Sequence, residues 1–158
     1  MRVNLAYGKT GLILDFPEAW NIQVVEPAYP PALLEPLRQL AVALEHPIEA
    51  CALREMVKPN STVGIILNDM TRATPNALIL DGLLEQLSFL PNQNIRLFIA
   101  LGTHRVMSDS ELIEQLGLEN FQHFTIIQNN AFDPDTQTYL GRTSQSHEIW
   151  INRDLMNC

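Results

Sequence analysis

Lysine is scarce in this chain of 158 residues. The sequence has 10 Lys and Arg against 18 Asp and Glu, for a formal net charge of −8. Its only lysines are Lys9 and Lys58. Because nucleic acids and anionic lipids are bound by clustered basic side chains, this balance argues against both as partners. A charged fraction of 18% with 46% hydrophobic residues also excludes a disordered acidic tail and suits one compact domain with a sizeable core.

Cysteine is also scarce, and long apolar runs and cofactor motifs are missing. Cys51 and Cys158 are too far apart for a metal or redox spacing, and a small disulfide framework would use more cysteines. The chain has no P-loop, no GxGxxG and no pair of histidines at metal-ligand spacing. Because no signal peptide or membrane-length apolar run is present, we expect a soluble, cytoplasmic protein without a membrane partner.

The first third of the sequence predicts a β-hairpin followed by two helices. Val3–Tyr7 and Leu12–Asp15 alternate around the turn-rich tetrapeptide GKTG, and Asn21–Val25 is predicted as a third short strand. A helical period of leucines begins at Pro31 and is stopped by Pro47. A shorter helix is predicted over Ile48–Met56.

The remainder alternates between buried strands and helices. Short apolar runs predict strands at Ser61–Leu67, Ile95–Leu101, His123–Gln128 and Glu148–Asn152. The helices between them are predicted from Thr74-Pro75 to about Leu90, and over Glu111–Leu116 behind a Ser108 capping box and before Gly117. This order predicts an α/β fold with an open, mainly parallel sheet, helical crossovers and an N-terminal β-hairpin. No internal boundary is evident, so we expect a single α/β domain over residues 1–158.

Two polar loops follow neighbouring strands of the predicted sheet. In open α/β sheets, ligands bind outside the carboxyl ends of the strands, and the loops Asn68–Arg72 and Gly102–Arg105 lie there. Arg72 offers a planar fork for a carboxylate, and Asp69 is an acceptor three residues earlier. His104 suits proton transfer near neutral pH. The two loops therefore predict a site for a small carboxylate.

Structural roles are the alternatives for the same side chains. Asp69 and Arg72 are equally well interpreted as a loop salt bridge, which would contribute only about 0–1 kcal/mol at the surface. His104 alone is more often a hydrogen-bonded loop histidine than a catalyst. Thr71 and Thr74 are alternatively helix caps, and Arg105 is expected to be solvated.

The order of several motifs resembles the N-terminal catalytic domain of the nickel-pincer lactate racemase family, the 2-hydroxyacid racemases and epimerases. The most specific matches are the segments Asn68–Pro75 (NDMTRATP) and Ala100–Arg105 (ALGTHR). Weaker matches extend over essentially the whole chain, at Tyr7–Gly11, His46–Ile48, Leu116–Gly117, Leu140–Thr143 and Ile151–Arg153.

The resemblance implies a site and a reaction. Asp69 and Arg72 would bind the hydroxyl and carboxylate region of a small 2-hydroxy acid, and His104 would be one of two acid/base histidines. The candidate substrate-binding residues are Asp69, Thr71, Arg72, Gly102 and Thr103. In the family, a nickel-pincer nucleotide tethered to a lysine exchanges a hydride with the substrate, which amino-acid side chains alone cannot do.

The chain departs from this family pattern in its lysines. The family's second histidine, its tethering lysine and its further nickel-ligand histidine lie beyond residue 158, and no lysine follows Lys58 here. We therefore expect a truncated N-terminal part that is inactive alone, binds neither metal nor cofactor, and has the missing C-terminal part of the same protein as its partner. A homo-oligomer formed at an uncovered sheet edge after Glu148–Asn152 is a further expectation. Two alternatives to a racemase part are a stand-alone carboxylate-binding or regulatory module and a scaffold without a ligand.

Overall fold

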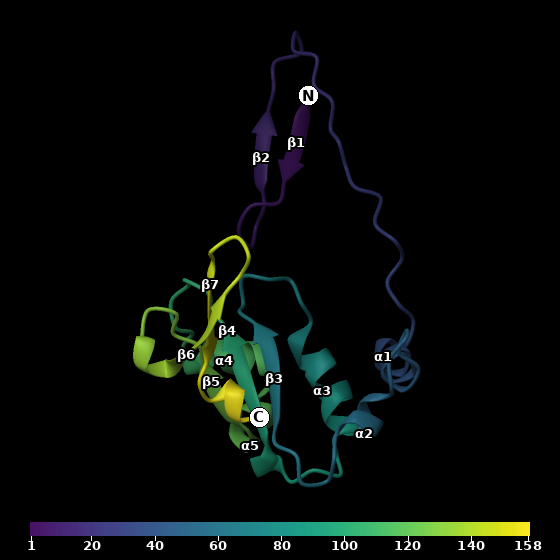
Figure 1. The fold of residues 1–158 in the computed structure, drawn as a ribbon. Coiled ribbons are helices and arrows are strands. Elements are labelled where there is room, and N and C mark those ends of the chain that lie inside the picture. The colour runs from purple at the N-terminus through teal and green to yellow at the C-terminus, as the bar shows by residue number, and fades with distance from the viewer. The chain divides into compact units, whose positions relative to one another are not determined.

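The computed structural model describes all 158 residues, which divide into two compact units, Met1–Leu33 and Leu34–Cys158. In the first unit, β1 (Arg2–Leu5) and β2 (Leu12–Asp15) form the predicted antiparallel hairpin (Figure 1). Arg2 lies opposite Asp15 in the register, and their side chains form an ion pair with an N–O distance of 2.8 Å. The strand predicted at Asn21–Val25 is wrong: this segment has no strand partner, because β2 pairs with β1 alone.

The second unit begins with two helices, α1 (Pro36–Glu45) and α2 (Leu53–Met56). The predicted start of the first helix at Pro31 is wrong. Glu35 has a left-handed backbone (φ 54°), and the helix begins at Pro36, whose fixed φ suits a first helical position. The helix ends just before Pro47, as predicted. The second helix is shorter than the predicted Ile48–Met56.

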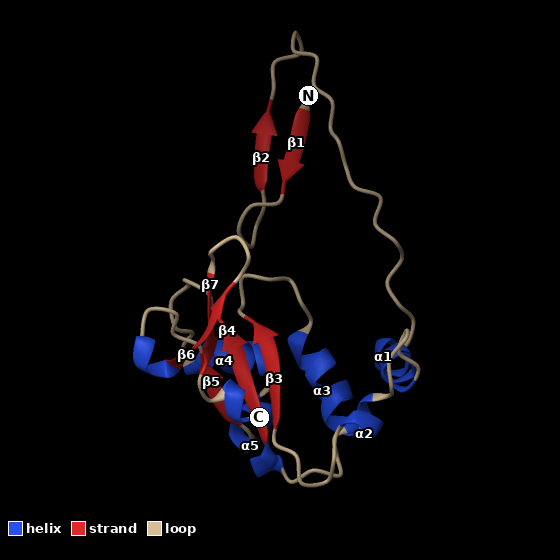
Figure 2. Ribbon diagram, in the orientation of Figure 1, coloured by secondary structure: helices blue, strands red, loops and turns tan.

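A parallel three-stranded sheet forms the centre of this unit (Figure 2). Its order is β3 (Val63–Asn68), β4 (Ile95–Ala100) and β5 (Thr125–Gln128). The crossovers are α3 (Asn76–Gln86) between the first two strands, then α4 (Asp109–Leu116) and α5 (Leu118–His123). The α/β fold with helical crossovers is confirmed. None of the helices has the length and apolarity that crossing a membrane requires.

The hydrophobic core lies between one face of this sheet and the crossover helices. Ile65, Leu97 and Ile99 point to this face and pack in one cluster with Leu80 of α3 and Leu116 of α4. All except Ile65 are completely buried. Such alternation is expected where strands place successive side chains on opposite faces. The core thus holds rigid the strands whose carboxyl ends carry the polar loops.

The other face of the sheet is partly covered by the C-terminal segment. β6 (Gln137–Arg142) and β7 (Glu148–Asn152) pair antiparallel in a sheet of their own. The expectation that Glu148–Asn152 joins the mainly parallel sheet is therefore wrong, although the strand itself exists. The turn Leu155–Asn157 packs on this face as well, since a Cβ on Gly64 would lie 2.7 Å from Cδ1 of Leu155.

Candidate functional site

Three loops meet at the carboxyl end of the parallel sheet. Asp69 follows β3, Gly102–Met107 follows β4, and Asn129 follows β5. Because these strands are parallel neighbours, their carboxyl ends lie at one edge, and the sheet brings together side chains that are 35 residues apart in sequence. The predicted position of the site is therefore the one at which polar side chains gather.

Asp69 and His104 form a hydrogen-bonded pair at this edge. Nδ1 of His104 lies 2.5 Å from Oδ2 of Asp69, and Thr71 Oγ1 donates to the other carboxylate oxygen at 2.7 Å. Asp69 is buried, with 5% of its surface exposed. The His104 side chain is 52% exposed. The buried carboxylate thus holds one edge of an imidazole whose other edge is free.

The electrostatics of the pair set the tautomer of His104. The Thr71 hydroxyl, followed by the His104 ring, lowers the pKa of Asp69 below its ordinary value of 3.8. Asp69 is then an acceptor only at neutral pH, so Nδ1 of His104 must carry the proton of the hydrogen bond. In the neutral ring this leaves a lone pair on Nε2, which has no hydrogen-bond partner in the structure. An imidazole held in this way is suited to take a proton from a bound ligand.

The loop that carries His104 is anchored on both sides. Arg105 donates two hydrogen bonds to Glu111, at 2.9 and 2.6 Å, and therefore is exposed but paired, not merely solvated as predicted. This guanidinium, with the Ser108 backbone N–H, lowers the pKa of Glu111 to about 2. Glu111 and Ser108 also form the predicted capping box at the start of α4. The loop is thereby joined to the first turn of a helix.

Gln128 holds the loop from the neighbouring strand. Its Nε2 donates to the Met107 carbonyl at 2.9 Å, and its Oε1 accepts from the Met107 backbone N–H at 2.7 Å. The side chain of Met107 is itself buried in the core. Gln128 is not among the site residues predicted from the sequence, although its position as the last residue of a predicted parallel strand is a usable signal.

The loop that carries Asp69 has its own supports. Asn76 Nδ2 and Gln115 Nε2 both donate to the Asn68 carbonyl, at 3.0 and 2.6 Å. The side chain of Asn68 donates to Thr74 Oγ1 at 2.7 Å. The predicted N-cap role of Thr74 is wrong, because the N-cap position of α3 is Pro75 and no side chain caps the helix. The predicted end near Leu90 is also wrong, since α3 ends at Gln86.

Arg72 is not part of the Asp69–His104 pair. Its side chain makes no ion pair or hydrogen bond, so the salt bridge with Asp69 that spacing allowed is absent. It lines a cavity of about 170 Å³ together with Glu111, Glu114 and Gln115, whereas His104 lines a different one. The exposed guanidinium is thus available to an anion, but it and the imidazole line different cavities.

The cavity beside His104, here the His104 cavity, has a volume of about 340 Å³. Gly102 and Thr103 line it, as does Asn129 from the loop after β5. Gly102 has φ 58°, and nothing lies within 4 Å of where its Cβ would be, so the backbone there is open to a ligand. Of the predicted residues, the structure places Gly102, Thr103 and His104 around one cavity, with Asp69 and Thr71 behind the imidazole.

The remaining histidines do not join this site. His123 ends α5 and contacts the Glu119 carbonyl, at 2.7 Å, and neither His46 nor His147 lines a cavity with His104. No three His, Cys, Asp or Glu side chains are grouped so as to hold a metal ion.

The chain is thus an α/β protein in which a buried carboxylate orients a half-exposed histidine at the carboxyl ends of parallel strands. The sequence model of the lactate racemase N-terminal domain family matches residues 7–158. The chain belongs to this family.

Two curated relatives are lactate racemases. The one from Lactiplantibacillus plantarum is 28% identical over 112 residues, which are 70% of this chain and 26% of the relative. The one from Thermoanaerobacterium thermosaccharolyticum is 22% identical over 155 residues, which are 96% of this chain and 36% of the relative. The chain therefore spans about a quarter to about a third of the length of these relatives.

Two solved structures share the fold. The lactate racemase apoprotein from T. thermosaccharolyticum matches 97% of this chain and 36% of its own, with 21% identity and a TM-score of 0.74. A protein from Thermotoga maritima matches 74% of this chain and 30% of its own, with 21% identity and a TM-score of 0.58.

Proposed function

We propose that the chain is the N-terminal portion of a 2-hydroxyacid racemase or epimerase of the lactate type and contributes substrate binding and one acid/base group. The hydrogen-bonded Asp69–His104 pair is the observation that carries this proposal. It supplies a base of defined tautomer beside an open cavity, in a chain of the lactate racemase N-terminal domain family.

His104 is proposed to move the hydroxyl proton of the substrate. Its Nε2 accepts the proton while Nδ1–H stays bonded to Asp69, which stabilises the imidazolium that forms. Asp69 is therefore a positioning residue, and Thr71 keeps its carboxylate in place through the second oxygen. The proton returns from Nε2 when the hydroxyl is re-formed, so this exchange is balanced over one turnover.

Arg72 is proposed to bind the substrate carboxylate. Its guanidinium is exposed and without a partner, and such a fork binds carboxylates in a bidentate manner. Because Arg72 and His104 line different cavities in this structure, binding one substrate through both requires the exposed side chain of Arg72 to turn toward Gly102 and Thr103, while Asp69 and Thr71 stay in place.

Inversion at the α-carbon by removal of its hydrogen as a hydride also requires a hydride acceptor, which no amino-acid side chain provides. The nickel-pincer nucleotide that the resemblance implies for the full-length family would supply this hydride chemistry. The residues of this chain do not fit that cofactor on their own. No three His, Cys, Asp or Glu side chains are grouped to bind a metal ion, and no lysine after Lys58 is present to tether the nucleotide. We therefore assign no step to it and expect the chain to be inactive alone.

Titration of the chain with lactate tests the binding half of the proposal. Lactate should shift the ring signals of His104 in an NMR spectrum, and propionate, which lacks the hydroxyl, should bind more weakly. Arg72→Ala should weaken lactate binding by about tenfold to a hundredfold, the cost of losing a charge-assisted contact. Arg153→Ala is the matched control, because Arg153 is an exposed arginine whose side chain has no partner. Equal binding of lactate by the Arg72→Ala and Arg153→Ala variants would contradict the assignment.

A carboxylate-binding or regulatory module without catalysis is the second candidate, because the Asp69–His104 pair forms entirely within the chain. Both candidates predict lactate binding, and the gene distinguishes them. A reading frame that continues beyond codon 158 and encodes a His and a Lys within a few dozen codons supports the racemase. A continuing frame without them supports the binding module.

A further inference from the structure

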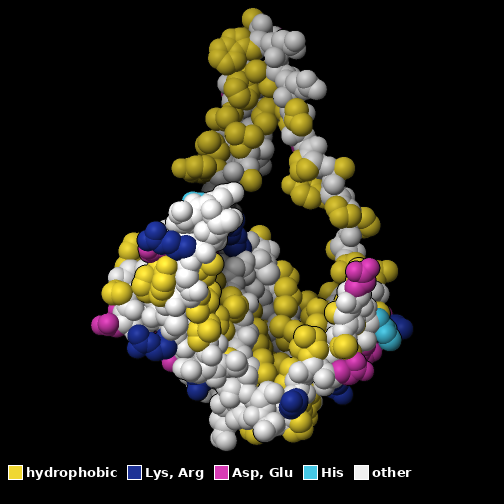
Figure 3. Space-filling model, viewed as in Figure 1, with side chains coloured by type: hydrophobic (Ala, Val, Ile, Leu, Met, Phe, Trp, Pro, Cys, Tyr) yellow, Lys and Arg dark blue, Asp and Glu magenta, His cyan; other side chains and the backbone are white.

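A second cavity adjoins the His104 cavity and is mostly apolar. This cavity, here the hairpin cavity, lies between the outer face of the parallel sheet and the β6–β7 hairpin and has a volume of about 290 Å³. The sheet contributes Ile66, Phe98 and Ala100, and the hairpin contributes Trp150 and Ile151. Figure 3 shows hydrophobic side chains exposed on the face of the second unit that carries β3 and β7. Among the lining residues, Ile66 is 59% and Trp150 48% exposed.

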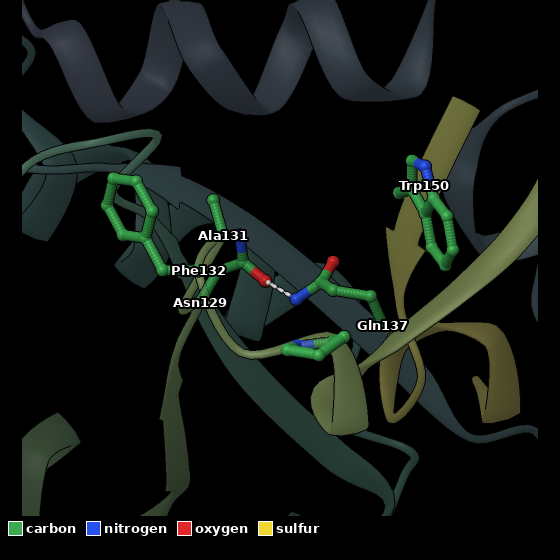
Figure 4. Close-up of a pocket in the computed structure, with 6 residues that line it drawn as sticks. Asn129, Ala131, Phe132, Gln137 and Trp150 are labelled. Carbon is green, nitrogen blue, oxygen red and sulfur yellow. Dashed lines mark hydrogen bonds between the residues drawn. The ribbon is translucent and has the colours of Figure 1, made fainter. Parts of the chain in front are cut away.

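The two cavities are neighbours at the end of β4 and at the loop after β5. Gly102 and Asn129 line both of them. A third cavity of about 330 Å³, drawn in Figure 4, extends the space between Phe132, Gln137 and Trp150 and is again lined by Asn129. Each volume is at the lower limit of the roughly 300–1,000 Å³ of ligand pockets, so one small molecule can occupy the His104 cavity and extend into the apolar one.

Asn129 presents a polar donor where the cavities meet. Its Oδ1 accepts from Gln137 Nε2 and from Asn152 Nδ2, both at 3.1 Å, and Figure 4 shows the first of these bonds. Because two donors converge on this oxygen, the amide is held in one orientation, with Nδ2 directed away from them. Nδ2 has no partner in the structure and is not sealed from solvent. It is a preorganised donor for a ligand oxygen.

We propose that the hairpin cavity is the side-chain subsite for a 2-hydroxy acid with an aromatic or branched apolar side chain, and that Asn129 Nδ2 hydrogen-bonds an oxygen of the same ligand at the junction. This inference rests on the proposed function, because it takes the His104 cavity as the place of the hydroxy-acid group. Lactate, whose side chain is a methyl group, would leave the subsite empty.

The shape and composition of the hairpin cavity support an aromatic side chain in particular. Trp150 forms one wall and is itself packed against Tyr139, with ring centroids 4.9 Å apart. An aromatic ligand ring can pack against this wall with an offset or edge-to-face geometry. The polar side chains of this cavity are the amides of Asn129, Gln137 and Asn152, which bond one another, and the other walls are mostly apolar. Mostly apolar walls with a few placed polar groups are typical of sites that bind apolar ligands with one polar end.

Tryptophan NMR signals test the subsite directly. The chain has two tryptophans, Trp20 and Trp150, so its spectrum contains two indole N–H signals, which Trp20→Phe assigns. The probes are lactate, 3-phenyllactate and 3-phenylpropionate, which lacks the hydroxyl. We expect 3-phenyllactate to shift the signals of both Trp150 and His104, and to bind at least about tenfold more tightly than lactate, because it buries additional apolar surface.

Substitutions that fill the hairpin cavity, compared with the same substitution elsewhere, test the subsite a second way. Ala100→Leu places a larger side chain in the hairpin cavity and should bring the ratio of 3-phenyllactate to lactate affinity close to one. Ala43→Leu makes the same change at an exposed position of α1 and should leave this ratio as it is. Asn129→Asp, which replaces the donor by an acceptor, should weaken both hydroxy acids.

Five results would overturn the inference. If lactate and 3-phenyllactate bind equally and both shift His104, the subsite is wrong and the proposed function stands. If neither ligand shifts His104, the proposed function fails as well. If 3-phenyllactate shifts Trp150 but not His104, or if 3-phenylpropionate binds as well as 3-phenyllactate, the apolar cavity is unconnected with the hydroxy-acid site. If the Trp150 signal moves with protein concentration alone, a second copy of the chain occupies the cavity.

Discussion

Replacing Gln128 by Ala should loosen the loop that carries His104. The side-chain amide of Gln128 bonds both backbone groups of Met107, with distances of 2.7 Å to the N–H and 2.9 Å to the carbonyl. Alanine removes both bonds at once. Met107 is 4% exposed and belongs to the core. Its backbone N–H and carbonyl can therefore form hydrogen bonds with water only if this core residue moves.

The size of the effect follows from these two hydrogen bonds. Each contributes about 0.5–1.5 kcal/mol net, so Gln128→Ala should lower the free energy of unfolding by about 1–3 kcal/mol. For a chain of this length the midpoint of thermal unfolding should fall by about 2–12 °C, at roughly 2–4 °C per kcal/mol. The ring signals of His104 should also shift or broaden, because its loop is released from β5.

Urea unfolding followed by circular dichroism measures the first effect. Gln122→Ala is the matched control, because Gln122 is an exposed glutamine of α5 whose side chain makes no hydrogen bond. A Gln128→Ala variant that unfolds within about 0.5 kcal/mol of this control, the usual range of surface substitutions, would refute the reasoning.

Two further predictions concern the core and a charged cap. Leu97→Ala empties a fully buried position of β4 and should cost about 2–5 kcal/mol in urea unfolding; a loss below about 1 kcal/mol would contradict the packing. The pKa of Glu111 is lowered from 4.5 to about 2, mainly by Arg105, so the stability from its charge is complete above about pH 4.5 and is lost as the pH falls toward 2. Glu111→Gln should flatten the pH dependence of stability in this window, and an unchanged slope would count against the ion pair.

The parallel sheet could be predicted from the sequence because its signals are local. Apolar runs such as STVGIIL and IRLFIAL, each followed by a helix, indicate buried strands with crossovers, and the Ser108 capping box marks the start of α4. The β6–β7 hairpin depends on tertiary context. Gln137–Arg142 is mostly polar, and its pairing has a register shift between Tyr139 and Gly141. Its sequence therefore lacks the alternation of polar and apolar residues that would predict a strand.

The site could be predicted in position but not in its pairings. Asp69 and His104 follow neighbouring strands, and parallel topology brings such loops together. Which side chain Asp69 contacts depends on how the loops turn, and the structure pairs it with His104 rather than with Arg72, three residues away. The role of Gln128 needs the same information, because its partner Met107 lies 21 residues earlier.

The tautomer of His104 tests the account most directly. Long-range ¹H–¹⁵N NMR correlations distinguish the two ring nitrogens, and His104→Gln identifies its signals among those of the four histidines. We predict that the neutral ring carries its proton on Nδ1, held there by Asp69, and that the signal of the unprotonated Nε2 shifts when a 2-hydroxy acid is added. A ring protonated on Nε2, or signals that are the same in the Asp69→Asn variant, would contradict it.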